Sequence, residues 1–155
     1  VLVDGRILDG RVGEHDRRGI LPLLGIGRQV RDHVAPDIEG SLDEIDRERR
    51  ALASYLRFVF EHKEVYRIID EAEFVDPAGF RTHYETAAAR IATRLEDAVA
   101  KGQMRDDGPL ATEVRAWAIM GMNVFLGLRF GVWGRQDAEL VAAHANAMLR
   151  KGLER

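Results

Sequence analysis

The stretch AWAIMGMNVFLGLRFGVWG, from Ala116 to Gly134, is 19 residues long and carries a single charge, on Arg129. Its length is marginal for a membrane span. In a membrane, Arg129 and Asn123 would lie in hydrocarbon at a cost of several kcal/mol. We therefore expect a helix outside the membrane that is buried on nearly all sides, partly in a core and partly against a partner.

Two apolar faces are predicted for this helix, which should run from Gly108-Pro109 to about Val132. The first face comprises Val114, Trp117, Ala118, Gly121, Phe125 and Leu128. The second comprises Ala116, Ile119, Met120, Gly127 and Phe130. A last helix should start at Gln136 or Asp137, rich in alanine, with a stripe formed by Leu140, Val141, Ala145, Met148 and Leu149.

Upstream of this pair, the pattern predicts three more helices. Gly27 to Ala35 can form a short helix that Pro36 ends. Ser41 and Glu44 have capping-box spacing, so a long helix should run to about Asp70, with a break allowed near residues 47–50. Asp76-Pro77 should begin another helix, ended by Gly102. The chain is therefore predicted to be an all-α bundle of five or six helices.

The first 27 residues differ from the rest, because they hold six of the 15 glycines. Short apolar pieces are separated there by Asp4-Gly5 and Asp9-Gly10, which are hairpin-turn signals. We interpret residues 1–27 as an irregular segment or linker and residues 28–155 as one helical domain.

The composition disfavours several functions. There is no cysteine, which excludes disulfides, thiol catalysis and cysteine-held metals, and which fits a reducing, cytoplasmic setting. No two of the five histidines are three or four residues apart, and serine occurs only twice, so we expect no metal site, no cofactor and no enzyme. The net charge of −3 makes the chain alone a poor nucleic-acid binder.

Aromatic side chains at helical spacing are typical of a core, and that interpretation stays open. A bundle whose helices diverge also leaves an apolar cavity with a few polar groups, which is the usual make-up of a small-molecule site. The candidate lining residues, from three helices, are Phe58, His62, Tyr66, Tyr84, Trp117, Met120 and Asn123.

Two segments together carry a family resemblance. They are EHKEVYRIIDEAEFVDPAGFRTHYETAAARIATRLEDAVAKGQMR (Glu61–Arg105) and EVRAWAIMGMNVFLGLRFGVW (Glu113–Trp133). Their order is a Glu-His corner, an Asp-Pro turn, a long helix ending in Lys-Gly-x-x-Arg, and an apolar helix with Met-Gly and Leu-Gly-Leu-Arg. Over roughly residues 28–155, the chain resembles the C-terminal domain of TetR-type transcriptional regulators.

The resemblance implies a domain that binds a small apolar or amphipathic effector and pairs its last two helices with those of a second subunit in a four-helix interface. It points to a homodimer formed through Val124, Gly127, Leu128, Gly131, Leu140, Val141, His144, Ala145 and Met148. The family binds DNA through a preceding helix-turn-helix domain. Residues 1–27 are too short and too rich in glycine for one, so we expect DNA contact only through a domain outside this chain.

Two other functions are compatible with the sequence. The first is a small all-α enzyme, which a shifted carboxylate beside a histidine in a pocket would support. The second is a dimerising interaction module without a ligand, which would titrate a full-length homologue into inactive heterodimers. A solidly packed interior would favour this second alternative.

Overall fold

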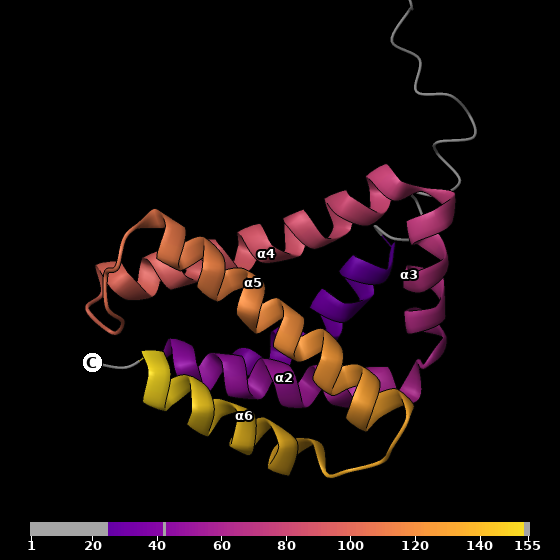
Figure 1. The fold of residues 1–155 in the computed structure, drawn as a ribbon. Helices are drawn as coiled ribbons and strands as arrows, with labels where there is room; N and C mark the ends of the chain where they lie inside the picture. Colours follow the sequence, from indigo (N-terminus) through magenta and orange to yellow (C-terminus); the bar gives the residue numbers. More distant parts are fainter. Residues whose placement is uncertain (1–24, 42, 154–155) are drawn as a thin grey trace, which may run out of the picture.

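The computed structural model describes residues 25–41 and 43–153, and over these ranges the chain is all-helical, without a strand (Figure 1). Residues 25–34 are helical and lead into a 3-10 turn, η1. The elements that follow are η1 (Ala35–Ile38), α2 (Glu44–Glu61), α3 (Glu64–Val75), α4 (Pro77–Ala100), α5 (Pro109–Leu126), the π-helical segment η2 (Gly127–Val132) and α6 (Ala138–Leu153). The predicted all-α fold is confirmed.

The helices form a bundle in which α5 crosses in front of α2 (Figure 1). Helix α6 lies along α2, α4 packs along α5, and α3 joins the α2 and α4 sides at one end. The helical segment 25–34 lies inside this frame, where Ile26 is buried with Phe58, Val59 and Val65. A second cluster, containing Ile91, Leu95 and Ile119, fills the space between α4 and α5.

Local chemistry explains where the helices begin. The Asp76 carboxylate accepts from the Gly79 amide at 2.9 Å, with Pro77 at the first helical position, so the predicted start of α4 is confirmed. Asp43, not Ser41, caps α2, accepting from the Asp46 amide at 2.6 Å. The Ser41 hydroxyl instead donates to the Ile38 carbonyl at 2.6 Å and closes η1.

The prediction of one helix from Ser41 to about Asp70 is wrong. The chain leaves the helical region at His62 (φ −128°, ψ 56°), and α3 begins at Glu64. Neither glycine nor proline stands at the break, and α2 is continuous through residues 47–50. The corner lets Val65 and Tyr66 pack back against α2, so burial overrides local helix propensity.

Only one of the two predicted faces of α5 is buried. Ala116, Ile119, Met120 and Gly127 lie in the interior, whereas Val114, Trp117 and Phe125 are exposed. Leu128 and Phe130 are exchanged relative to the prediction. Leu128 packs against the cluster around Phe58, and Phe130 lines a surface groove, because the π-helical segment shifts the helical register after residue 126.

The start of the predicted helical domain needs correction, whereas the predicted start of α6 near Asp137 is confirmed. Residues 25–27 are helical although the sequence placed them in the irregular segment, and α6 begins at Ala138, where the Leu140 amide donates to the Asp137 carboxylate at 2.9 Å. The interpretation of residues 1–24, with the turns at Asp4-Gly5 and Asp9-Gly10, lies outside the described residues. Among the helices described, none has the length and hydropathy that crossing a membrane requires.

A charged cluster is buried where α2 meets α4. The Arg94 guanidinium bonds Glu44 Oε1 at 3.0 Å and also binds Glu48, and both carboxylates are buried. Burial raises the pKa of Glu48 above its ordinary value, although the neighbouring Arg94 acts in the opposite direction. Folding therefore makes the Glu48 carboxyl group harder to ionise than it is in the unfolded chain.

We predict that Glu48→Gln removes a pH-dependent penalty. A carboxyl group whose pKa is raised by folding contributes stability below its unfolded pKa and loses that contribution as pH rises through its folded pKa. The amide oxygen of the introduced glutamine can still accept from Arg94. In urea unfolding, the free energy of unfolding of E48Q relative to wild type should therefore increase from pH 4.5 towards neutral pH.

The matched control is Arg94→Met, which leaves Glu48 without its cation and Glu44 with Arg47 alone at 3.4 Å, and which should cost about 3–5 kcal/mol at neutral pH. A stability difference between E48Q and wild type that does not change with pH would contradict the raised pKa of Glu48 in the folded chain.

Candidate functional site

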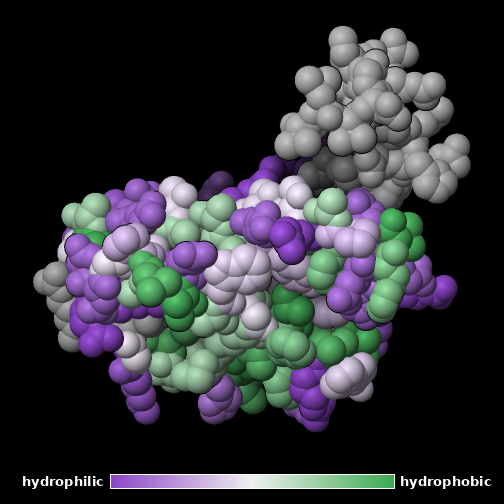
Figure 2. Space-filling model, turned by 45° about the horizontal axis from the view of Figure 1, so that its top comes forward, coloured by the Kyte–Doolittle hydropathy of each residue, from purple (hydrophilic) through white to green (hydrophobic). Residues whose placement is uncertain are grey.

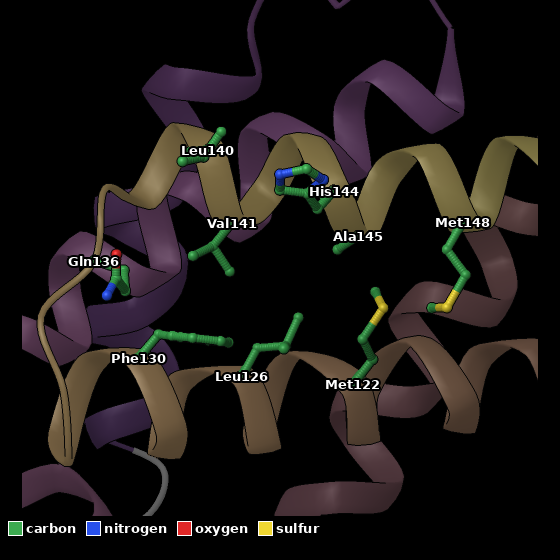
Figure 3. Close-up of a pocket in the computed structure, with 9 residues that line it drawn as sticks. All are labelled: Met122, Leu126, Phe130, Gln136, Leu140, Val141, His144, Ala145 and Met148. Atoms are coloured by element: carbon green, nitrogen blue, oxygen red, sulfur yellow. The ribbon is translucent and has the colours of Figure 1, made fainter.

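An apolar groove runs between α5 with η2 on one side and α6 on the other (Figure 3). It encloses about 370 Å³. Figure 3 shows side chains from the two helices pointing towards one another across it. The lining residues are Met122, Leu126, Phe130, Gln136, Leu140, Val141, His144, Ala145 and Met148. Seven of these nine are apolar, so the groove favours an apolar occupant.

Alanine residues set the depth of this groove. Ala142 and Ala145 of α6 are buried against Leu52, Ala53 and Leu56 of α2. Because the alanine side chains are small, α6 lies close to α2 and leaves its other side open towards α5. Met122 and Leu126 pack on the same cluster from the α5 side and form the opposite wall.

A second apolar feature adjoins the groove on α5. Its members occur at steps of three or four residues and therefore share one side of the helix, turned away from the buried residues. They are Leu110, Val114, Trp117, Gly121 and Phe125. Phe125 is 70% exposed, and across the groove Leu140 is 56% and Met148 61% exposed. We refer to this stripe together with the groove as the outer face.

Polar groups gather inside the bundle where α2, α3 and α5 meet. The Tyr66 hydroxyl donates to the Val124 carbonyl oxygen at 2.5 Å. The Tyr55 and Tyr66 hydroxyl oxygens are 2.9 Å apart. Since the single Tyr66 proton is used on Val124, Tyr55 must be the donor between the two hydroxyls. Asn123 directly precedes Val124 in the chain, and its buried side-chain oxygen has no hydrogen-bond partner.

All three tyrosines of the chain are hard to ionise. Burial raises the pKa of Tyr55 to about 12, against the lowering effect of its hydrogen bond with Tyr66. Burial and the neighbouring Tyr55 raise the pKa of Tyr66 further, and burial with nearby Asp70 and Glu73 raises that of Tyr84. At neutral pH these hydroxyls are therefore hydrogen-bonding groups and not bases.

The backbone of η2 lies directly against these tyrosines. A Cβ atom at Gly127 would overlap the Tyr66 hydroxyl and lie 2.9 Å from Tyr55 Cε1. One at Gly131 would lie 2.7 Å from Val59 Cγ1. Both glycines are therefore required by the close approach of η2 to α2 and α3. A side chain at either position would force η2 away from these helices.

The structure brings together only some of the seven candidate pocket residues. Tyr66 lies beside the Asn123–Val124 backbone, and Tyr84 is close enough to raise the pKa of Tyr66. Met120 is buried in the cluster against which Tyr84 packs. The three others lie elsewhere: Phe58 is buried between the rings of His33 and His62, His62 is exposed at the α2–α3 corner, and Trp117 is on the outer face.

The nine predicted interface residues fall into two sets. Five line the groove: Leu140, Val141, His144, Ala145 and Met148. Four contact α2 or α3 within the chain: Val124, Gly127, Leu128 and Gly131. The prediction missed Tyr55 and the groove residues Met122, Leu126, Phe130 and Gln136. The four-residue spacing of Met122, Leu126 and Phe130 is the signal that could have identified the wall.

Within residues 25–41 and 43–153, no group of three or more His, Asp or Glu side chains is arranged to hold a metal ion. No protein-family model matches the sequence, and a search of curated proteins finds no significant match.

We predict that tyrosine ionisation accompanies unfolding. A phenol whose pKa is raised by folding contributes stability below its unfolded pKa of 10 and loses it at higher pH. In the folded chain, fewer than half of the three tyrosines should be ionised at pH 10, whereas in denaturing urea about half should be. The measurement is tyrosinate absorbance recorded alongside far-UV circular dichroism, and equal absorbance in both solvents would contradict it.

Proposed function

We propose that this chain is the effector-sensing and homodimerising domain of a TetR-like transcriptional regulator. The observation that carries the proposal is the outer face, an uncharged apolar surface formed by the last two long helices. Figure 2 shows hydrophobic side chains gathered in a broken band across the lower half of the view, with hydrophilic side chains above it, at its sides and projecting below it. Contiguous apolar surface of this kind is typical of protein–protein contacts.

A second copy of the chain is the partner that suits this surface. The outer face presents a ridge, the stripe along α5, beside the groove between α5 and α6. Under two-fold symmetry, each ridge can enter the partner's groove. Helices of 18 and 16 residues are about 25 Å long, so two of them side by side cover an area of the same order as the about 800 Å² per partner of a stable interface.

The charges at the start of α6, at one end of the outer face, are paired within the chain. Glu139, at the start of α6, binds Arg49 of α2 at 3.0 Å and Arg57 at 2.9 Å. Arg57 also binds Asp37 of η1 at 2.7 Å. Because these groups pair on the α2 side, the surface offered to a partner stays apolar, and its burial carries little cost of charge desolvation.

The effector would complete the interior beside Tyr66, Tyr84 and Asn123. The Asn123 oxygen is a buried acceptor without a donor, which is costly unless another group fills that role. A small, mainly apolar molecule with one hydrogen-bond donor fits these surroundings. DNA binding would belong to a domain outside this chain.

We predict that Phe125→Asp abolishes dimerisation. Two aspartates would enter each interface, and two large apolar side chains would be lost, so the dimer dissociation constant should rise at least about 100-fold. The change should not unfold the monomer, because Phe125 is 70% exposed. Sedimentation equilibrium over a range of concentrations measures the constant.

The matched control is Phe74→Asp on α3. Phe74 is 84% exposed and lies outside the outer face, so F74D should dimerise like wild type. A wild-type chain that stays monomeric at all concentrations, or equal effects of F125D and F74D, would overturn the dimerisation proposal.

We predict that native mass spectrometry of the purified chain gives a species at twice 17.4 kDa that carries a small-molecule adduct. The adduct should be lost in Asn123→Leu, which removes the interior acceptor, and kept in F125D, which alters only the outer face. A dimer without an adduct would instead support the dimerising module without a ligand.

A further inference from the structure

The end of α5 changes its hydrogen-bond pattern at one place. Up to Leu126 the helix is α-helical, and from Gly127 to Val132 it is π-helical. The Trp133 amide donates to the Leu128 carbonyl at 3.0 Å, a step of five residues. Short π-helical segments inside α-helices are rare and frequently mark functional sites.

The Tyr66 hydroxyl enters the backbone ladder where this change begins. It donates to the carbonyl oxygen of Val124, which also accepts from the amide of Gly127, the first residue of the π-helical segment. A side chain inserted into this ladder is a recognised cause of a local change in helix geometry. The adjacent Gly127 leaves the space that the Tyr66 hydroxyl occupies.

The π-helical segment keeps the α5 wall of the groove in line. In an α-helix, each four-residue step overshoots a full turn by about 40°. Over Met122, Leu126 and Phe130 this drift would turn Phe130 away from α6. A π-helix has more residues per turn, so the step from Leu126 to Phe130 reverses the drift. Figure 3 shows the three side chains in one row facing α6.

We propose that Tyr66 is a positioning residue that sets the shape of the groove. Its hydrogen bond to Val124 holds η2 in the π-helical form and thereby keeps Phe130 in the groove wall. If α3 moves and withdraws the hydroxyl, residues 127–132 can rewind as α-helix, and Phe130 leaves the row. A movement of α3 inside the bundle would thus change the shape of the groove through the Tyr66 hydroxyl group alone.

This inference deepens the proposed function, on which its regulatory meaning rests. Tyr66 lies on α3, beside the interior where the effector is proposed to bind, and Phe130 lies on the surface proposed to meet a second copy. Binding inside would then alter dimerisation by shifting the balance between two forms of one helical segment.

The test compares Tyr66→Phe with Tyr55→Phe. Each variant loses one hydroxyl and keeps its ring, but only Y66F removes the bond to Val124, so Y55F controls for the loss of a buried hydroxyl. The first readout is the methionine methyl spectrum of the labelled chain. Met122 and Met148 report on the groove, and Met104, buried with the α4–α5 cluster, serves as an internal reference.

We expect Y66F to shift the Met122 and Met148 signals, leave Met104 in place and speed amide exchange at Trp133 about tenfold. Y55F should match wild type in all three. Gly127→Ala, whose Cβ would displace the Tyr66 hydroxyl, should shift the same two signals and thereby provides a second route to the same state.

Unchanged groove signals and unchanged Trp133 exchange in Y66F would overturn the inference. Equal changes in Y66F and Y55F would also overturn it, because they would show a general loss of packing. These readouts are made on the chain in any oligomeric state. They therefore decide the role of Tyr66 even if sedimentation shows a monomer and the dimerisation proposal fails.

Discussion

The hydrogen bond from the Tyr66 hydroxyl to the Val124 carbonyl fixes how α2, α3 and α5 meet. The arrangement of the rest of the bundle depends on this junction. Tyr66 belongs to α3, its donor Tyr55 to α2, and Val124 to the last turn of α5. A buried phenol or carbonyl left unpaired would cost about 1–3 kcal/mol, so the three groups favour one relative position of their helices. Apolar packing alone tolerates more arrangements.

Apolar residues occur on most sides of α5, so this helix contributes both to the interior of the bundle and to its surface. One side is covered by α4 and another by α2, where Tyr66 of α3 also bonds Val124, but a bundle of this size has no further layer to cover the third. That third side is the outer face. The charged side chains of α2, α4 and α6 pair with one another at the other junctions, so hydrophobic contact is the interaction the outer face offers.

Local signals were sufficient to predict much of the fold. Asp76-Pro77 marked the start of α4, and Gly102, with a φ of 71°, follows its end as expected. Apolar periodicity did not predict the corner at His62, which only the Glu-His corner of the family resemblance indicated, because its cause is the burial of Val65 and Tyr66 against a helix that precedes them in sequence. Local propensity contains no information about such contacts.

The limits of local sequence patterns also affected the prediction of which residues line the site. A period of 3.6 residues placed Leu128 with Phe125, and Phe130 with Ile119. The π-helical segment exchanged the two, and it depends on a hydroxyl 58 residues away in the chain. The α6 residues that line the groove needed no such knowledge, since the alanines and the apolar stripe of α6 follow a regular helix to its end. Sequence patterns therefore placed the α6 residues of the groove on one side of their helix, but they did not group Met122, Leu126 and Phe130 on one side of α5.

The interior gives a reason to prefer a sensor over a module that only dimerises. Dimerisation needs the outer face, and nothing on that face requires an amide at position 123. An unpaired buried amide oxygen costs about 1–3 kcal/mol, and a leucine of similar size would avoid that cost. The Asn123 oxygen is thus a local conflict with stability, and such conflicts are expected where a site serves a function. Under the proposed function, a small molecule inside the bundle would remove the conflict, because it would supply the missing donor.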